Sequence, residues 1–228
     1  QAKLKSEFAS HLSHDLRRPL TSIRMFSEML KNNDVPSEEK KKEYYGIISE
    51  ESDKLTHLAN NILDFSRIEA GRRKYNMKPE DITRVVIETV ERFKVYTINE
   101  TRTVKLNKDA DFGKVERLEE GTKNNYPMVK VDAGAISQAL MNLLTNADKY
   151  SPPEKEVVVN LRKTKKHVVI EVIDQGEGIP KEEQKKVFQK FYRVARRDVS
   201  EIEGSGLGLA LVKYTAEAHG GRVTLESE

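Results

Sequence analysis

Four residues near the start of the chain have the types and spacing for phosphoryl chemistry: His14, Asp15, Arg17 and Arg18. A neutral imidazole is a nucleophile, and a neighbouring carboxylate can hold its other ring N–H and orient it. Arginines about one helical turn further on attract a phosphoryl group. The segment therefore offers a phosphate acceptor, although its spacing alone favours a plain surface histidine beside a proline.

Helical geometry predicts that His14 is exposed. The apolar residues around it share one face of a helix, and at about 100° per residue His14 points almost opposite to them. Pro19 cannot donate a hydrogen bond to the carbonyl of Asp15, so we expect a kink one turn past His14.

A second group of polar residues lies on one face of a predicted helix at 135–149. Asn142, Asn146, Lys149 and Tyr150 follow the spacing i, i+4, i+7 and i+8. Amide oxygens, together with phosphates and waters, suit Mg²⁺, and a lysine neutralises phosphate charge. Asparagines that are simply solvated explain this face equally well.

A third segment joins a strand to a carboxylate and two glycines: Asp174, Gly176 and Gly178. Glycines let the backbone approach a planar ligand, while the carboxylate accepts a hydrogen bond from the amino group of that ligand. Taken alone, the segment is better explained as a strand that ends in a tight turn.

A fourth segment has three alternate glycines, Gly204, Gly206 and Gly208, at the start of a helix, where free N–H groups and the positive helix end attract phosphates. It is not a P-loop, because the chain has no Gly-Lys-Ser/Thr after four spacer residues, and it is not a dinucleotide fingerprint, because Leu209 takes the place of the third glycine. The polar residues 193–203 before it suggest a mobile lid over a nucleotide. The alternative is a flexible linker.

Two long helices are predicted to carry the first of these groups. Apolar residues alternate at spacings of four and three in both, and residues 31–37 form a turn that ends in Ser37, a good N-cap. A single hairpin has a poor core, so we expect a homodimer whose hairpins form a four-helix bundle. The seam residues are Leu12, Leu16, Ile23, Phe26, Leu30, Tyr44, Ile48, Leu55, Leu58, Ile62 and Phe65.

The heptad pattern stops at residues 70–73, and a mixed pattern follows. Asp81 is a predicted N-cap, short strands are expected at 129–131, 157–161 and 168–173, and helices at 135–149, 181–191 and 207–218. Residues 109–126 have no predicted element. The expected fold class is thus α plus α/β: a helical hairpin over 1–72, then an α/β domain over 73–228.

Composition excludes several classes of protein. The net charge of +3, from 40 basic and 37 acidic residues, gives no electrostatic case for binding nucleic acid. Cysteine is absent, which excludes disulfides, thiolate nucleophiles and zinc–thiolate sites and fits the cytoplasm. The chain starts inside a helical pattern and contains no apolar run of the roughly 20 residues that a membrane helix needs. We therefore expect an excised fragment whose membrane anchor, if there is one, precedes it.

In this order along the chain, these segments resemble the motifs of the sensor histidine kinase family. Residues 8–23 are similar to its phosphoacceptor box, 142–150 to its asparagine box and 174–178 to its first glycine box. Residues 187–193 resemble the phenylalanine box and 204–208 the second glycine box, whose helix runs on to His219, Gly220 and Gly221. The resemblance covers nearly the whole chain and is weakest over 97–126.

The resemblance implies a left-handed α/β sandwich that binds Mg-ATP and a role for each residue. His14 would attack the γ-phosphate, with Asp15 orienting or deprotonating its ring, and the phosphate would pass to an aspartate of a response regulator. Asn146 and Asn142 would be magnesium ligands, and Lys149 and Tyr150 would lie near the phosphates and ribose. The remaining contacts with ATP would come from Asp174, Gly176, Gly178 and Arg193, and from the segment Gly204, Gly206, Leu207 and Gly208.

Two departures from the family pattern matter. The position four residues after the phosphoacceptor is often Thr or Asn, which positions the water that dephosphorylates the regulator, but here it is Arg18. We therefore expect weak phosphatase activity. The chain also stops at Glu228, where the family usually adds a glycine turn and a last strand, so an open sheet edge is expected.

Two other classes compete with a kinase. A clamp ATPase of the same nucleotide fold explains the asparagine and glycine boxes but leaves the His14 segment without a purpose. A dimeric scaffold that binds ATP without transferring phosphate would need a defect in the site, and none of the residues named above is missing. The stimulus, the identity of the regulator and the choice between transfer within a subunit and across the dimer are not encoded in these motifs.

Overall fold

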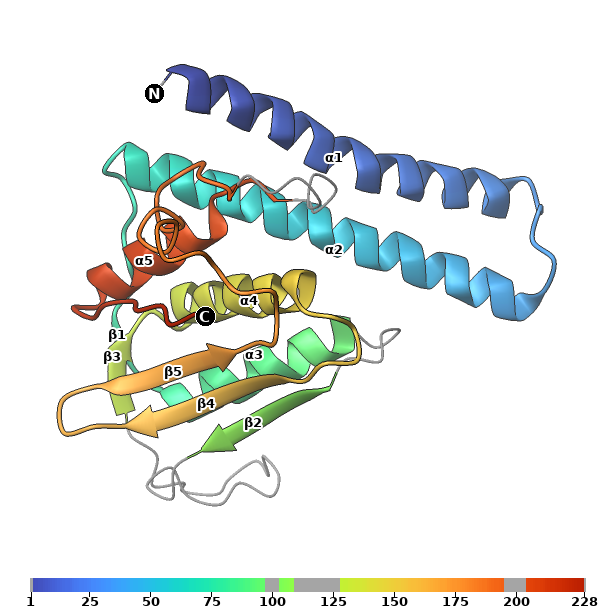
Figure 1. Cartoon of the computed structure of the whole chain (residues 1–228). Coiled ribbons are helices and arrows are strands. Elements are labelled where there is room, and N and C mark those ends of the chain that lie inside the picture. Colours follow the sequence, from blue (N-terminus) through green and yellow to red (C-terminus); the bar gives the residue numbers. More distant parts are fainter. Residues whose placement is uncertain (1, 97–102, 109–127, 195–203, 228) are drawn as a thin grey trace. The chain divides into compact units, whose positions relative to one another are not determined.

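The computed structural model describes residues 2–96, 103–108, 128–194 and 204–227 (Figure 1). The chain divides into two compact units. Gln1–Arg73 and Lys186–Ala210 form the first unit, and Lys74–Lys185 and Leu211–Glu228 form the second. The elements are α1 (Ala2–Lys31), α2 (Glu38–Glu69), β1 (Lys78–Asp81), α3 (Ile82–Tyr96), β2 (Val104–Lys108), β3 (Met128–Val131), α4 (Ala133–Tyr150), β4 (Val157–Lys163), β5 (Val168–Ile173) and α5 (Gly208–Ala218).

In the first unit, α1 and α2 pack side by side as a hairpin (Figure 1). None of the predicted seam residues is exposed, and the rings of Phe26 and Tyr44 lie 4.8 Å apart across the hairpin. Ser37 caps α2 as predicted, because its side chain accepts a hydrogen bond from the N–H of Lys40 at 3.2 Å. The sequence pattern thus located both helices and the side on which they meet.

Pro19 lies inside α1, which continues from Ala2 to Lys31. The kink expected one turn past His14 stays a prediction.

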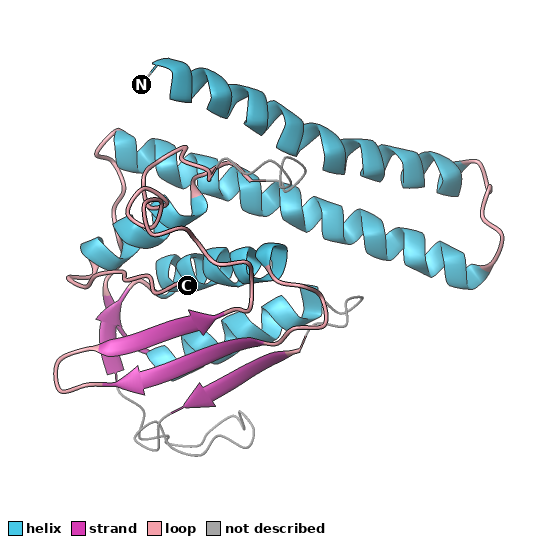
Figure 2. Cartoon of the chain, in the orientation of Figure 1, coloured by secondary structure: helices cyan, strands magenta, loops and turns pink. Residues whose placement is uncertain are grey.

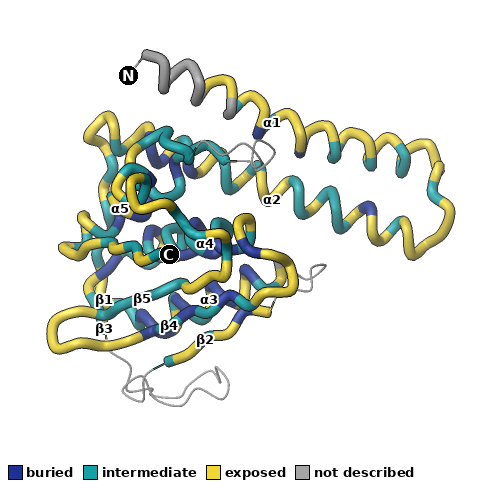
Figure 3. Tube along the Cα trace, viewed as in Figure 1, coloured by how far each residue is buried: buried dark blue, intermediate teal, exposed yellow. Residues whose placement is uncertain are grey.

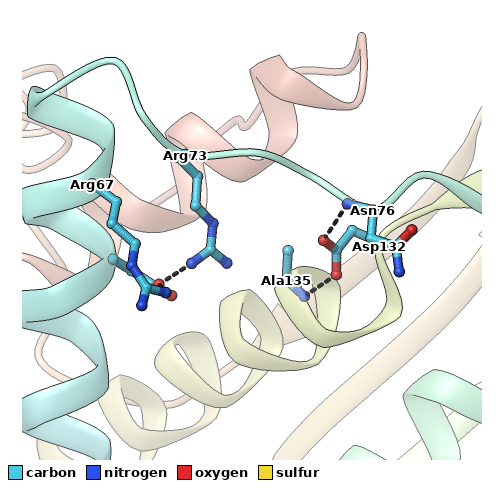
Figure 4. A network of polar contacts seen from close by, with 6 residues as sticks. Arg67, Arg73, Asn76, Asp132 and Ala135 are labelled. Carbon is cyan, nitrogen blue, oxygen red and sulfur yellow. Dashed lines mark hydrogen bonds and ion pairs between the residues drawn. The ribbon is translucent and has the colours of Figure 1, made fainter.

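The end of α2 is fixed by side-chain and backbone contacts. Gly71 adopts a left-handed conformation with φ of 63°, and the N–H groups of Arg72 and Arg73 both donate to the carbonyl of Arg67. The guanidinium of Arg73 folds back to the buried carboxylate of Asp64, one turn inside α2 (Figure 4). The helix therefore ends where the heptad pattern stops.

The second unit contains a three-stranded sheet of order β2-β4-β5 and a separate antiparallel pair, β1 and β3 (Figure 2). β4 pairs parallel to β2 and antiparallel to β5. Alternate residues of β4 point to one side, where Val157, Val159 and Leu161 are completely buried. They form one core with buried side chains of α3 and α4, including Val86, Val90, Phe93, Leu140 and Leu144. Figure 3 marks where buried residues lie along these helices and β4.

Most of the predicted elements of the second unit are present. Asp81 caps α3, since its carboxylate accepts from the N–H groups of Thr83 and Arg84. Two strands were not predicted: β1, which is short and polar, and β2, a five-residue strand in which Val104 and Leu106 alternate with polar residues. Residues 109–126, for which no element was predicted, lie outside the described residues.

The helix predicted at 181–191 is wrong, because this segment forms successive turns. Its first N–H groups, those of Glu183 and Gln184, both bond to the carbonyl of Pro180, and the Gln184 side chain is held by the carbonyls of Ile179 and Ser227. At the other end Phe191 is left-handed, with φ of 65°. Local sequence pattern favoured a helix, but contacts with distant parts of the chain, such as Ser227 and Gly206, decide the backbone here.

β5 forms an edge of the described three-stranded sheet. The last described residues approach the segment that follows this strand, where the N–H of Ile179 donates to Ser227 Oγ at 2.8 Å.

Among the described residues, no helix is both long and apolar enough to cross a membrane.

Two fully buried threonines of α3 differ in their partners. The Thr83 hydroxyl has no hydrogen-bond partner among the residues that the structure describes, whereas Thr89 Oγ1 bonds to the Val85 carbonyl and to Ser137 Oγ, both at 2.7 Å. We predict that Thr83→Val leaves the free energy of unfolding unchanged or raises it by about 1 kcal/mol, and that Thr89→Val lowers it by about 1–2 kcal/mol. Urea unfolding of both variants measures the difference, and equal destabilisation would contradict the prediction.

Candidate functional site

His14 is exposed on α1, as predicted, while Asp15 is turned into the protein and is only 8% exposed. Neighbouring residues of a helix point about 100° apart, and no hydrogen bond joins these two described side chains. Arg17 and Arg18 are exposed beside His14. The structure thus presents the imidazole to an incoming group, and the orienting role of Asp15 stays a prediction.

In the second unit, α4 presents the predicted polar face. Asp132 caps the helix, because its Oδ1 accepts from the N–H of Ala135 at 3.0 Å. Asn142 is buried, Asn146 is half-buried, and Lys149 and Tyr150 at the end of the helix are exposed. Leu140, Leu144 and Ala147 are buried in the core, so the position of this polar face is set by core packing.

The third segment meets the end of α4. After β5, the exposed Asp174 accepts a hydrogen bond from the N–H of Gly176 at 2.8 Å, and Gly178 has a φ of 73°. A Cβ atom added to Gly176 would lie 2.7 Å from the backbone oxygen of Tyr150 and 2.9 Å from Asp174 Oδ1. Only glycine fits this approach, which brings the residues after β5 against the last residue of α4.

Within the first unit, the second glycine segment packs against the backbone of Phe191. The N–H of Phe191 donates to the Gly206 carbonyl at 3.0 Å, and a Cβ on Gly206, whose φ is 67°, would lie 2.8 Å from Phe191 C. Leu207 is completely buried, and Gly208 begins α5. Arg193 is half-buried and Gly204 has open space around it. Most of the predicted lid, 195–203, lies outside the described residues.

Residues just before this segment contact α2 within the same unit. The rings of Phe191 and Phe65 meet edge to face, with centroids 5.2 Å apart. Lys190 Nζ lies 2.6 Å from Glu69 Oε2 and 5.9 Å from the centre of the Phe65 ring. Sequence reasoning missed this contact, because Phe65 was assigned only to the hairpin seam.

The predicted site residues therefore fall into two groups. His14, Asp15, Arg193, Gly204, Gly206, Leu207 and Gly208 belong to the first unit. Asn142, Asn146, Lys149, Tyr150, Asp174, Gly176 and Gly178 belong to the second. The structure brings the asparagine face and the first glycine segment together, and it describes each unit separately.

No cluster of three or more His, Cys, Asp or Glu side chains that could hold a metal occurs in the described part of the chain. The oxygen donors at the candidate site are instead the amides of Asn142 and Asn146. Neutral amide oxygens suit Mg²⁺, which commonly keeps several waters and takes further ligands from substrate phosphates. The donor set thus fits a magnesium ion that arrives with a nucleotide.

Two family models match the chain. Residues 4–71 match the "His Kinase A (phospho-acceptor) domain", and residues 131–228 match the "Histidine kinase-, DNA gyrase B-, and HSP90-like ATPase". The first match contains the exposed His14, and the second contains α4, Gly176 and the second glycine segment.

Several known proteins are similar to nearly the whole of this chain. The circadian input-output histidine kinase CikA of Synechococcus elongatus is 33% identical over 98% of this chain and 28% of its own length. Among solved structures, full-length ShkA in complex with AMPPNP has a TM-score of 0.57 at 21% identity, over 94% of this chain and 41% of that one. ThkA in complex with the response regulator protein TrrA has a TM-score of 0.55 at 20% identity, over 96% and 57% of the two chains.

The fold and the two matches define a phosphoacceptor hairpin joined to an ATPase domain of the class shared by histidine kinases, gyrase B and Hsp90. The chain belongs to the sensor histidine kinases. It spans between 23 and 35% of the length of the curated relatives that it matches first. A clamp ATPase would have no use for the His14 segment. The match of residues 4–71 to a phospho-acceptor domain therefore argues against this alternative.

The close approach at Gly176 gives a stability prediction. Gly176→Ala is expected to lower the free energy of unfolding by about 1–3 kcal/mol, because the backbone at Tyr150 must shift to admit the methyl group. Gly134→Ala, in the first turn of α4, is the matched control, since its added Cβ would lie 3.4 Å from Asp132 Oδ1. Thermal unfolding compares the two variants. A Gly176→Ala protein as stable as Gly134→Ala would refute the tight approach.

Proposed function

We propose that this chain is the catalytic core of a sensor histidine kinase, which phosphorylates itself on His14 with Mg-ATP and passes the phosphate to an aspartate of a response regulator. The observation that carries the proposal is an exposed imidazole, opposite the hairpin seam, within the region that matches the phospho-acceptor family model. The ThkA–TrrA complex supports a receiver domain as the partner.

The proposed transfer is a displacement at the γ-phosphorus. A nitrogen of the neutral His14 ring forms the new N–P bond, the bond from this phosphorus to the bridging oxygen breaks, and ADP leaves with that electron pair. The ring loses its proton to Asp15 or to water. Asp15 is buried in the structure, so its side chain must turn toward the ring to accept the proton or to orient it.

The nucleotide is proposed to occupy the two glycine segments and the polar face of α4. Asn146, with Asn142, would hold Mg²⁺, which would neutralise phosphate charge. Lys149 and Tyr150 would contact the phosphates and ribose, and Asp174 would accept the adenine amino group beside Gly176 and Gly178. Arg193 would contact the γ-phosphate, and Gly204, Gly206, Leu207 and Gly208 would form the hinge of the lid. The AMPPNP complex of ShkA and the ATPase family match support this assignment.

The domain boundaries are proposed at 1–72 for the phosphoacceptor region and 73–228 for the ATP-binding region. The family match that ends at residue 71 and the end of α2 at Glu69 support this division. The grouping of Lys186–Ala210 with the hairpin reflects contacts such as Phe65–Phe191. The cysteine-free composition supports a cytoplasmic location for this core.

The hairpin is proposed to form a four-helix bundle with a second copy. Large apolar side chains remain exposed on both helices: Leu20 (54%), Met25 (49%), Tyr45 (56%) and Leu63 (53%). We predict that the chain sediments as a dimer and that Leu20→Glu with Leu63→Glu gives folded monomers, because two charges would then be buried in the bundle. Sedimentation equilibrium tests this. A wild-type monomer, or a dimer that tolerates both glutamates, would contradict it.

The phosphate acceptor is tested by labelling. With γ-labelled ATP and Mg²⁺, we predict that the wild-type protein gains an acid-labile, base-stable label, that His14→Ala loses it and that both bind nucleotide. His167→Ala is the matched control, since His167 is also exposed but lies between β4 and β5. Label that persists in His14→Ala, or phosphate release without labelled protein, would contradict the proposal.

The phosphatase prediction concerns Arg18, which is exposed one turn from His14. A guanidinium can only donate hydrogen bonds, so it cannot accept a hydrogen bond from the attacking water as a Thr or Asn oxygen can. We predict weak dephosphorylation of the regulator by the wild-type protein and an increase of about tenfold or more in Arg18→Thr, measured as phosphate release from a phosphorylated receiver domain. Robust dephosphorylation that survives Arg18→Ala but needs His14 would overturn this prediction.

A further inference from the structure

His219, which follows the last residue of α5, uses both of its ring nitrogens. The backbone N–H of Asp132 donates to Nε2 at 2.9 Å, and Nδ1 lies 2.7 Å from the carbonyl oxygen of Thr215. An amide N–H can only donate and a carbonyl can only accept, so the neutral ring must carry its proton on Nδ1. His219 is therefore held as a single tautomer between two elements.

The partner of His219 is the residue that caps α4. Asp132 Oδ1 accepts from the N–H of Ala135 at 3.0 Å, and its Oδ2 accepts from the N–H of Asn76 at 2.8 Å (Figure 4). The ring of Tyr75 meets the edge of the His219 ring, with centroids 5.5 Å apart. These four residues, Tyr75, Asn76, Asp132 and His219, are called the α4 anchor below, and all belong to the second unit.

The anchor fixes the start of the helix whose other end meets Gly176. Asn146 lies about 21 Å along the axis from Asp132, so a tilt of about 3° at the start of α4 moves this amide by about 1 Å. Displacements of this size in a binding site cost affinity or rate by an order of magnitude or more. The position of the asparagine face thus depends on contacts at both ends of α4.

We propose that His219 is a positioning residue for the nucleotide site: by accepting from the Asp132 N–H, it holds the start of α4 and thereby the asparagine face. The proposal rests on the proposed function, since it assumes that this face binds Mg-nucleotide. His219 acts through Asp132, because no hydrogen bond or ring contact joins it to Asn142 or Asn146 among the described residues. The bond to Thr215, four residues earlier in the chain, keeps the ring oriented for this task.

Two substitutions distinguish the hydrogen bond at Nε2 from the one at Nδ1. In His219→Gln, the longer side chain can place its amide oxygen near the Nε2 position and keep the bond from Asp132. In His219→Asn, the shorter side chain can replace only Nδ1 and its bond to Thr215. Both variants lose the ring contact with Tyr75, so they are matched in packing.

The test is calorimetric binding of Mg–AMP-PNP, carried out on the full chain well below the unfolding temperatures of all variants. We expect His219→Asn to raise the dissociation constant about tenfold and His219→Gln to stay within about threefold of the wild type. The KM for ATP in His14 labelling should follow the dissociation constants, while kcat should change less.

Unchanged affinity in His219→Asn, or the same loss of affinity in His219→Asn and His219→Gln, would overturn the positioning role of His219. A merely structural histidine predicts that both variants lose the same stability while their affinities stay unchanged. Absence of nucleotide binding by the wild type would overturn the proposed function itself, and with it the site that the anchor serves.

Discussion

The close approach of Gly176 to the backbone of Tyr150 is the constraint on which the candidate nucleotide site depends. A backbone oxygen 2.7 Å from the position of a side-chain carbon leaves no room for any residue except glycine. The approach brings the carboxylate after β5 to the end of the helix that carries Asn142 and Asn146. Core packing by Leu140 and Leu144 sets the rotation of that helix, and the Asp132 cap sets its start.

The phosphoacceptor region depends on a different principle. A hairpin seam buries one face of α1 and leaves His14 on the other, so a nucleophile can be presented without any pocket around it. The exposed apolar residues of the same helices show that the hairpin has more apolar surface than one copy covers. A second copy would supply stability while His14 remains accessible.

The sequence predicted the elements whose signal is local. Heptad spacing located α1 and α2, Ser37 and Asp81 marked helix starts, and runs of β-branched residues marked β4 and β5. It failed where distant contacts decide the backbone, since turns replace the helix expected at 181–191. It also missed β1, which is polar, and β2, although Val104 and Leu106 of this short strand alternate with polar residues. The asparagine face was predicted from spacing. Spacing could not predict three contacts, because they join residues far apart in the chain. These are the contact of this face with Gly176, the Phe65–Phe191 pair and the His219–Asp132 bond.

A Mg-nucleotide is proposed to bind where the end of α4 meets the residues after β5. Titration of the ¹⁵N-labelled protein with Mg–AMP-PNP, followed by amide chemical shifts, tests it most directly. We expect the largest shifts on Asn146, Tyr150, Gly176 and Gly178. The amides of Asn107 and Asn160, whose side chains bond to each other across β2 and β4, should stay unchanged. Shifts confined to β2 and β4, with Gly176 and Asn146 unaffected, would contradict it.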